Sequence, residues 1–190
     1  YYSYGYSIRL VPLFWIFDNP THMYRAAIVL NAVMMSGSFL ICYDIAKKLA
    51  KDTNIFLLMA ISFVISMYPA YIVQTNVAWS ECALIFVCWL ITWIFIDLND
   101  KTSIMKFVLL GFLNAYAYII HQRAISILLA SFLVILLMKF LKKINWKQFG
   151  IFILVLGVML VIHKFIKNDI QTNNYLSSAS INNNDFVGQI

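Results

Sequence analysis

Charged residues are scarce in this sequence, and so are the residues that interrupt helices. Asp, Glu, Lys and Arg make up 12% of the 190 residues, whereas a soluble domain carries roughly 25%. Hydrophobic residues make up 63%, with only three prolines and six glycines. In lipid, the backbone polar groups of such a chain must be satisfied within helices. The composition therefore predicts an all-α, multi-pass protein of the cell membrane.

The motifs of soluble enzymes are also missing. The sequence has no P-loop, no GxGxxG, no HExxH and no CxxC. Its three cysteines, Cys42, Cys82 and Cys88, lie in apolar runs without metal-ligand or disulfide spacing. The net charge of +6 does not indicate nucleic acid, because the lysines gather in short segments between apolar runs. We expect no nucleic-acid partner and assign no metal ligands, and a divalent metal cofactor stays open.

The run 107–138 is apolar except for His121 and Arg123 near its middle. As one straight helix it would be ~48 Å long at 1.5 Å per residue, whereas a hydrocarbon core is about 30 Å thick. We therefore predict two spans, 107–120 and 124–138, with a turn at His121-Gln122-Arg123. Such a turn keeps the guanidinium at a membrane surface, where its charge is not costly.

The remaining apolar runs predict a polytopic transmembrane helix bundle of about six spans, preceded by an interfacial helix. Pro69 should kink or end the second span, and the Asn- and Ser-rich end should be an external loop. The predicted segments are an interfacial stretch 1–21, spans 24–45, 55–73, 77–96, 107–120, 124–138 and 149–165, and a loop 166–190.

The lysines predict an orientation. Nine basic residues lie in alternate connections and mark the cytoplasmic side: Lys47, Lys48, Lys51, Lys101, Lys106, Lys139, Lys142, Lys143 and Lys147. The other side carries five: Arg9, Arg25, Arg123, Lys164 and Lys167. The N-terminal segment, residues 74–81, the turn at 121–123 and the C-terminal segment should then face outward.

Polar residues on the outward side are the candidates for chemistry. Arg123 can bind a phosphate or pyrophosphate through its fork of donors, or it caps the hairpin beside a lipid headgroup. His121 can donate to the same anion or relay a proton, or it is a plain turn histidine. Glu81 can orient a sugar hydroxyl, pair with Arg123 or act as a base. Alternatively, Glu81 is a helix-start charge that follows Ser80.

The segment Asp97-Leu98-Asn99-Asp100 invites a metal hypothesis, because two carboxylates three residues apart can share a divalent ion. No third ligand accompanies them, and the segment falls on the lysine-rich side. A solvated loop is the simpler interpretation.

Several short stretches, taken in chain order, resemble GT-C fold glycosyltransferases, in particular glycosyltransferase family 39 and the polyprenyl-phosphate-mannose-type mannosyltransferases. The matching stretches are 5–7, 11–15, 24–32, 46–49, 68–70, 80–81, 121–124 and 184–189. The resemblance implies a cell-envelope enzyme that transfers a sugar from a polyprenyl-phosphate-linked donor on the outer membrane face. It also implies that basic residues such as Arg123 and His121 hold the donor phosphate.

In that family an acidic residue of the first external loop acts as base or orienting group, sometimes with a divalent metal. By this resemblance the sequence is a fragment, with its main catalytic carboxylate and one span upstream of Tyr1. At least two spans should follow Ile190. Two other classes stay open: a transporter or flippase of lipid-linked sugars, and a non-catalytic membrane assembly protein.

Overall fold

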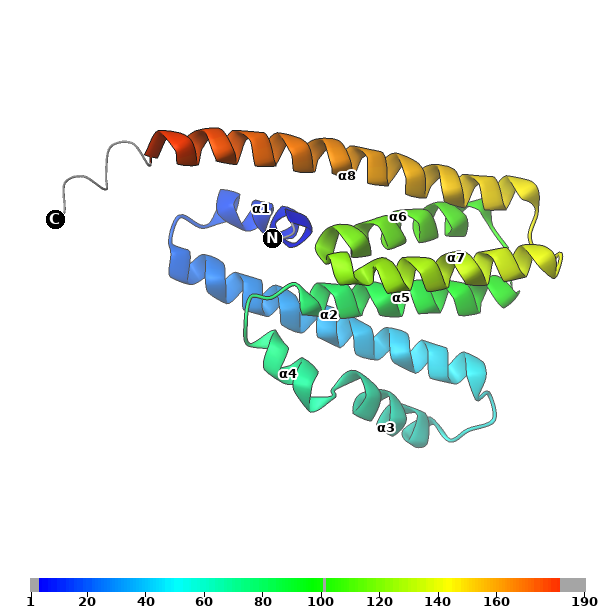
Figure 1. Ribbon diagram of the computed structural model, residues 1–190. Helices are drawn as coiled ribbons and strands as arrows, with labels where there is room; N and C mark the ends of the chain where they lie inside the picture. Colours follow the sequence, from blue (N-terminus) through cyan, green and yellow to red (C-terminus); the bar gives the residue numbers. More distant parts are fainter. Residues whose placement is uncertain (1–3, 101, 182–190) are drawn as a thin grey trace.

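The computed structural model describes residues 4–100 and 102–181, which are helical apart from short connections (Figure 1). The predicted all-α class is confirmed for these residues. The helices are α1 (Tyr4–Ile16), α2 (Pro20–Leu49), α3 (Ile55–Ser66), α4 (Pro69–Thr75), α5 (Glu81–Asp100), α6 (Ile104–Ile120), the 3-10 turn η1 (Gln122–Ala124), α7 (Ile125–Phe140) and α8 (Trp146–Ile181).

The long helices run back and forth along one direction (Figure 1). The connections α2–α3, α5–α6 and α7–α8 lie together at the right-hand end of Figure 1, and most of the lysines lie in these connections or within three residues of them along the sequence. The connections α1–α2, α4–α5 and α6–α7 lie toward the opposite end. We call these the lysine-rich end and the arginine end. Successive connections between the long helices therefore lie at alternate ends of the bundle, and the predicted orientation depends on this alternation.

Local signals set several helix boundaries. Asn19 caps α2 by accepting from the Thr21 amide at 2.8 Å, with Pro20 at the first helical position. Asn54 caps α3 in the same way. At the end of α7, Lys142 adopts a φ of 58° and the Lys143 amide donates to the Met138 carbonyl at 2.9 Å, as in a Schellman motif.

Among the described residues, four helical segments are long and apolar enough to cross a membrane: Pro20–Leu49, Glu81–Asp100, Gln122–Phe140 and Trp146–Ile170. Two further apolar helices, α3 and α6, are shorter. The second predicted span, 55–73, is two helices, because α3 ends at Ser66 and α4 begins at Pro69. Large apolar side chains also cover the outer faces, including Leu40, Phe63, Leu133 and Leu154 at 58–65% exposure. The chain is a membrane protein, since lipid is the solvent that such faces suit.

Helix α6 lies at the centre of the core. Phe107 and Leu110 of α6 and Phe152 of α8 are fully buried in one cluster with side chains of α5 and α7. At Gly111, an added Cβ would stand 3.0 Å from the Phe152 carbonyl oxygen and from the Val155 Cβ. The absent side chain thus lets α6 and α8 approach closely, as small residues do in membrane bundles.

The predicted loop over 166–190 is wrong as far as residue 181, because α8 continues to Ile181; residues 182–190 lie outside the described part. The residues after 166 are mostly polar, which suits a segment outside the apolar layer. A helix need not end where its side chains become polar. No Pro or Gly follows Gly157 before Ile181 to break the helix. The Thr172 hydroxyl donates to the Asn168 carbonyl one turn earlier.

The segment 97–100 is likewise not a loop but the last turn of α5. Asp97 accepts from Lys48 of α2 at 2.8 Å and from Lys106 of α6 at 2.7 Å. Lys48 also contacts Asp44, which accepts from the Trp93 indole at 2.6 Å. Asp97 therefore ties three helices together at the lysine-rich end.

Candidate functional site

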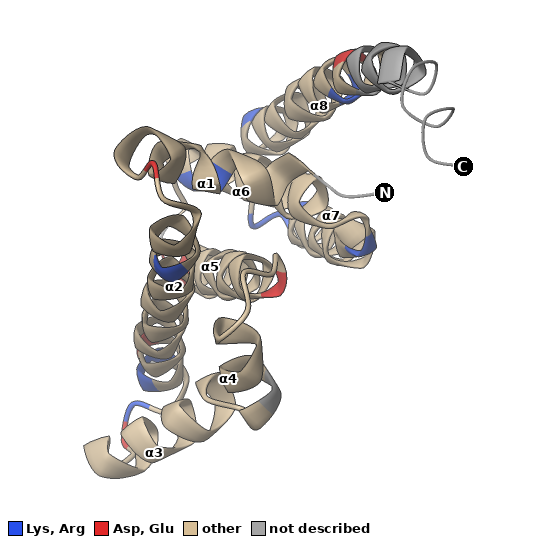
Figure 2. Cartoon of the chain, turned by 90° about the vertical axis from the view of Figure 1, so that its left-hand side faces the viewer, with Lys and Arg blue, Asp and Glu red and all other residues tan. Residues whose placement is uncertain are grey.

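A cavity of about 670 Å³ lies at the arginine end. Three separate segments line it: the start of α1, the connection into α5, and the α6–α7 turn. The lining residues are Tyr6, Ser7, Ala78, Trp79, Ser80, Glu81, Ile120, His121, Gln122 and Arg123. Glu81, His121 and Arg123, chosen from the sequence, thus face one hollow although 40 residues separate Glu81 from His121 along the chain. Figure 2 views the bundle from this end, with acidic and basic residues coloured.

The α6–α7 turn fixes how His121 and Arg123 are presented. Helix α6 ends at Ile120, and the extended backbone of His121 breaks it. The His121 Nδ1 accepts from the Arg123 amide at 3.1 Å, so the neutral ring carries its proton on Nε2. His121 can therefore offer an N–H donor to the cavity from Nε2. The Arg123 side chain is exposed, whereas Ala124 behind it is buried and anchors the turn.

Glu81 is the first residue of α5 and lies beside the cavity mouth. The Ser80 hydroxyl contacts its Oε2 at 3.5 Å, and the Ser80 carbonyl accepts from the Leu84 amide. Among the ion pairs of the described residues, none joins Glu81 to Arg123. The carboxylate and the guanidinium are thus both available to a ligand, rather than consumed by one another.

A partly buried set of hydrogen bonds beside the cavity is a feature that the sequence does not predict as part of a site. The Arg9 guanidinium of α1 donates to Asn31 Oδ1 at 2.8 Å, and the Asn31 amide donates to the Val77 carbonyl at 2.9 Å. Asn31 is fully buried. These hydrogen bonds join α1, α2 and the segment that leads into Glu81. The available signal was an arginine and an asparagine interrupting two apolar runs, but sequence spacing does not show that they pair.

Aromatic residues complete the cavity wall. Arg9 lies over the Tyr6 ring, 4.4 Å from its centroid. Burial raises the pKa of the Tyr6 phenol, and the Arg9 charge acts in the opposite direction. Tyr6 therefore remains a neutral hydroxyl at physiological pH. Trp79 is 55% exposed on the opposite segment and adds an open apolar face.

Gly5 allows α1 to close this wall. A Cβ at Gly5 would stand 2.5 Å from the backbone carbonyl of Ile119, closer than real side chains come. Only glycine lets α1 rest directly on the end of α6. That contact places Tyr6 and Ser7 beside Ile120 and His121.

The metal hypothesis at 97–100 gains no support from the geometry. Two lysines balance the Asp97 carboxylate, as described above. Within residues 4–100 and 102–181, no group of three or more His, Cys, Asp or Glu gathers so that it could hold a metal ion.

Comparison with family models, with curated proteins and with solved structures finds no match to this chain.

Proposed function

We propose that the chain is the membrane core of a glycosyltransferase that takes its sugar from a polyprenyl-phosphate-linked donor on the outer membrane face. The supporting observation is the cavity that gathers Arg123, His121 and Glu81 at the arginine end, opposite the lysine-rich end. The proposal uses about six spans: the four long apolar segments, α6, and the α3–α4 pair.

In this proposal Arg123 and His121 bind the phosphate of the donor. The exposed guanidinium offers a planar fork of N–H donors that matches phosphate oxygens. The His121 Nε2–H adds a donor from the same turn. Negative charge develops on the phosphate as the bond to the sugar breaks, so fixed positive groups stabilise the transition state more than the ground state.

Glu81 then orients the sugar. A carboxylate accepts hydrogen bonds from hydroxyl groups, and this one has no ion-pair partner among the described residues. Trp79 and Tyr6 supply aromatic surface in the same cavity. Ser80 and Ser7 add neutral hydroxyls that can donate or accept.

These residues do not by themselves supply the whole reaction. The acceptor hydroxyl must lose a proton to a positioned base, and we assign that role to the acidic residue that the family resemblance implies upstream of Tyr1. The cavity contributes one carboxylate and one imidazole, fewer ligands than the six to eight oxygens that Ca²⁺ takes or the octahedral set that Mg²⁺ requires. We therefore assign no metal to the cavity residues alone.

Sugar transfer by the full-length protein tests the proposal in membrane vesicles from its own cells, which supply the hydroxyl-bearing acceptor and from which the native copy has been deleted. The probes are polyprenyl-phosphate hexoses labelled in the sugar, and the readout is label lost from the lipid. The protein should release label, and Arg123→Ala should abolish release. Arg25→Ala, an exposed arginine at the same end that does not line the cavity, should retain it. Donor that binds but keeps its label throughout the hexose panel would contradict the transferase and favour a transporter.

A further inference from the structure

A second hollow, of about 440 Å³, lies between α7 and α8 at the arginine end. We call it the α7–α8 groove; its lining residues are Tyr118, Ile125, Leu128, Leu129, Leu160, His163, Lys164 and Lys167. It does not share a lining residue with the cavity of Arg123. Seen from this end in Figure 2, α7 and α8 stand apart.

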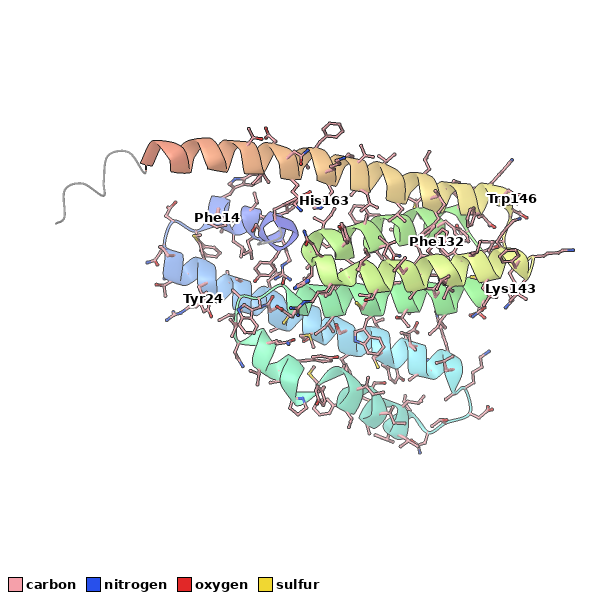
Figure 3. All side chains as sticks on the ribbon, viewed as in Figure 1. Phe14, Tyr24, Phe132, Lys143, Trp146 and His163 are labelled. Carbon is pink, nitrogen blue, oxygen red and sulfur yellow. The ribbon has the colours of Figure 1, made fainter. Side chains whose placement is uncertain are left out.

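The groove closes toward the lysine-rich end. There Phe132 of α7 lies 6.5 Å from Phe149 of α8, measured between ring centroids (Figure 3). Trp146 packs edge-on against the same Phe149. Toward the lysine-rich end, aromatic rings thus fill the space between α7 and α8, whereas the lining residues of the groove lie nearer the arginine end.

A fixed histidine forms part of its lining. His163 is 9% exposed, and its Nδ1 lies 2.7 Å from the Tyr4 hydroxyl. The Tyr4 ring stacks on it at 5.3 Å, and the Tyr118 ring meets it edge-on at 5.7 Å. These contacts tie α1, α6 and α8 together, so the lining is held in place rather than formed on binding.

The two lysines lie where a membrane surface should be. Lys164 and Lys167 follow Trp146 by 18 and 21 residues on α8, which is ~27 and ~32 Å along a helix. That is about the thickness of a hydrocarbon core. Spaced three apart, the two side chains share one helix face.

The described residues supply no counter-charge to these lysines. No carboxylate forms an ion pair with either one among the described residues. Asp169, on the same helix, does not line the groove. Positive groups are disfavoured on the outer side of membrane proteins. Two lysines there that have no ion-pair partner among the described residues are therefore unusual.

We propose that the α7–α8 groove binds an anionic phospholipid, with its phosphate between Lys164 and Lys167 and an acyl chain along Ile125, Leu128 and Leu129. The apolar wall suits a hydrocarbon chain and would not hold a free phosphate. The paired ammonium groups favour a headgroup with net negative charge over a zwitterionic one. This inference is independent of the glycosyltransferase proposal.

Lipid exchange on the full-length protein tests this site. The protein is placed in nanodiscs of equal phosphatidylglycerol and phosphatidylcholine, and native mass spectrometry counts the lipids that stay bound. Phosphatidylglycerol should be retained preferentially. The double variant Lys164→Gln/Lys167→Gln should lose that preference by roughly tenfold or more, since each basic residue near a lipid surface contributes measurably.

Two further variants separate charge from fit. Lys142→Gln/Lys143→Gln removes two exposed lysines at the other end and should leave retention unchanged. Leu129→Trp, at a side chain 54% exposed, keeps both charges but fills the groove, and should also reduce retention. The site is wrong if the Lys164/Lys167 variant matches the unmodified protein, if the Lys142/Lys143 variant loses as much, or if millimolar inorganic phosphate displaces the lipid.

Discussion

Arg9 and Asn31 are hydrogen-bonded at 2.8 Å, from the guanidinium of α1 to the side-chain oxygen in the middle of α2. Asn31 is fully buried and passes the connection on to the Val77 carbonyl. The pair thus holds the segment that carries Trp79 and Glu81 against two helices. We regard it as the support on which one wall of the cavity rests.

Replacing Asn31 by leucine should loosen that wall. The change leaves Arg9 Nη2 and the Val77 carbonyl, both partly buried, without their partner. A buried group left unsatisfied costs about 1–3 kcal/mol, and we expect a loss toward the lower end of that range. Hydrogen exchange should accelerate at amides 77–81, and the apparent Tm in detergent should fall. Ser36→Ala is the control on the same helix, because its hydroxyl is exposed and bonds only within α2. Equal exchange in the two variants would show that the Asn31 bonds do not hold the segment.

Gly5→Ala tests the close approach of α1 to α6. The added methyl meets backbone atoms of Ile119 and Ile120, which cannot turn aside as a side chain would. Helix α1 must therefore shift, at a cost of about 1–3 kcal/mol typical of overpacking. We expect a lower Tm and weaker donor binding. Gly157→Ala in α8 has open space around its Cβ, and should raise stability slightly through helix propensity, by up to about 1 kcal/mol. If Gly5→Ala leaves Tm and donor binding unchanged, the close contact between α1 and α6 is not required.

Cysteine labelling tests the orientation. In a background without Cys42, Cys82 and Cys88, single cysteines at positions 51 and 143 should be protected from an impermeant thiol reagent in intact cells. Cysteines at positions 76 and 122 should react, because these residues lie at the arginine end. Permeabilised cells, where all four should react, control for accessibility. Labelling of positions 122 and 143 from the same side would contradict both the predicted membrane hairpin and the outward orientation of the cavity.

Part of this architecture follows from length and charge alone. The run 107–138 is too long for one span, and its two ionisable residues lie where the chain has to turn; the structure places the turn at residues 121–124. Pro69 was expected to interrupt the second span, and a helix does begin there. These features depend on local chemistry, which a single sequence records.

Other features depend on partners far away in the chain. The bond between Arg9 and Asn31 spans 22 residues, and that between Asn31 and Val77 spans 46, so neither spacing identifies the pair. The sequence favours a solvated Asp97, because its lysine partners lie on two other helices and no local spacing identifies them. Helix α8 continues to Ile181 beyond the apolar residues, because a change from apolar to polar residues does not by itself end a helix.

Binding of polyprenyl monophosphate to the purified full-length protein tests the central claim most directly, because it isolates the role of Arg123 from sugar transfer. Losing a charge-assisted contact costs about 1.5–3 kcal/mol, which is roughly 10- to 150-fold in affinity. Arg123→Ala should therefore weaken binding by at least about tenfold. Arg123→Lys should recover part of the loss, because a point charge replaces a fork, and Arg25→Ala should bind like the unmodified protein. If Arg123→Ala binds the lipid phosphate as tightly as the unmodified protein, Arg123 is not its binding residue and the account of the cavity is wrong.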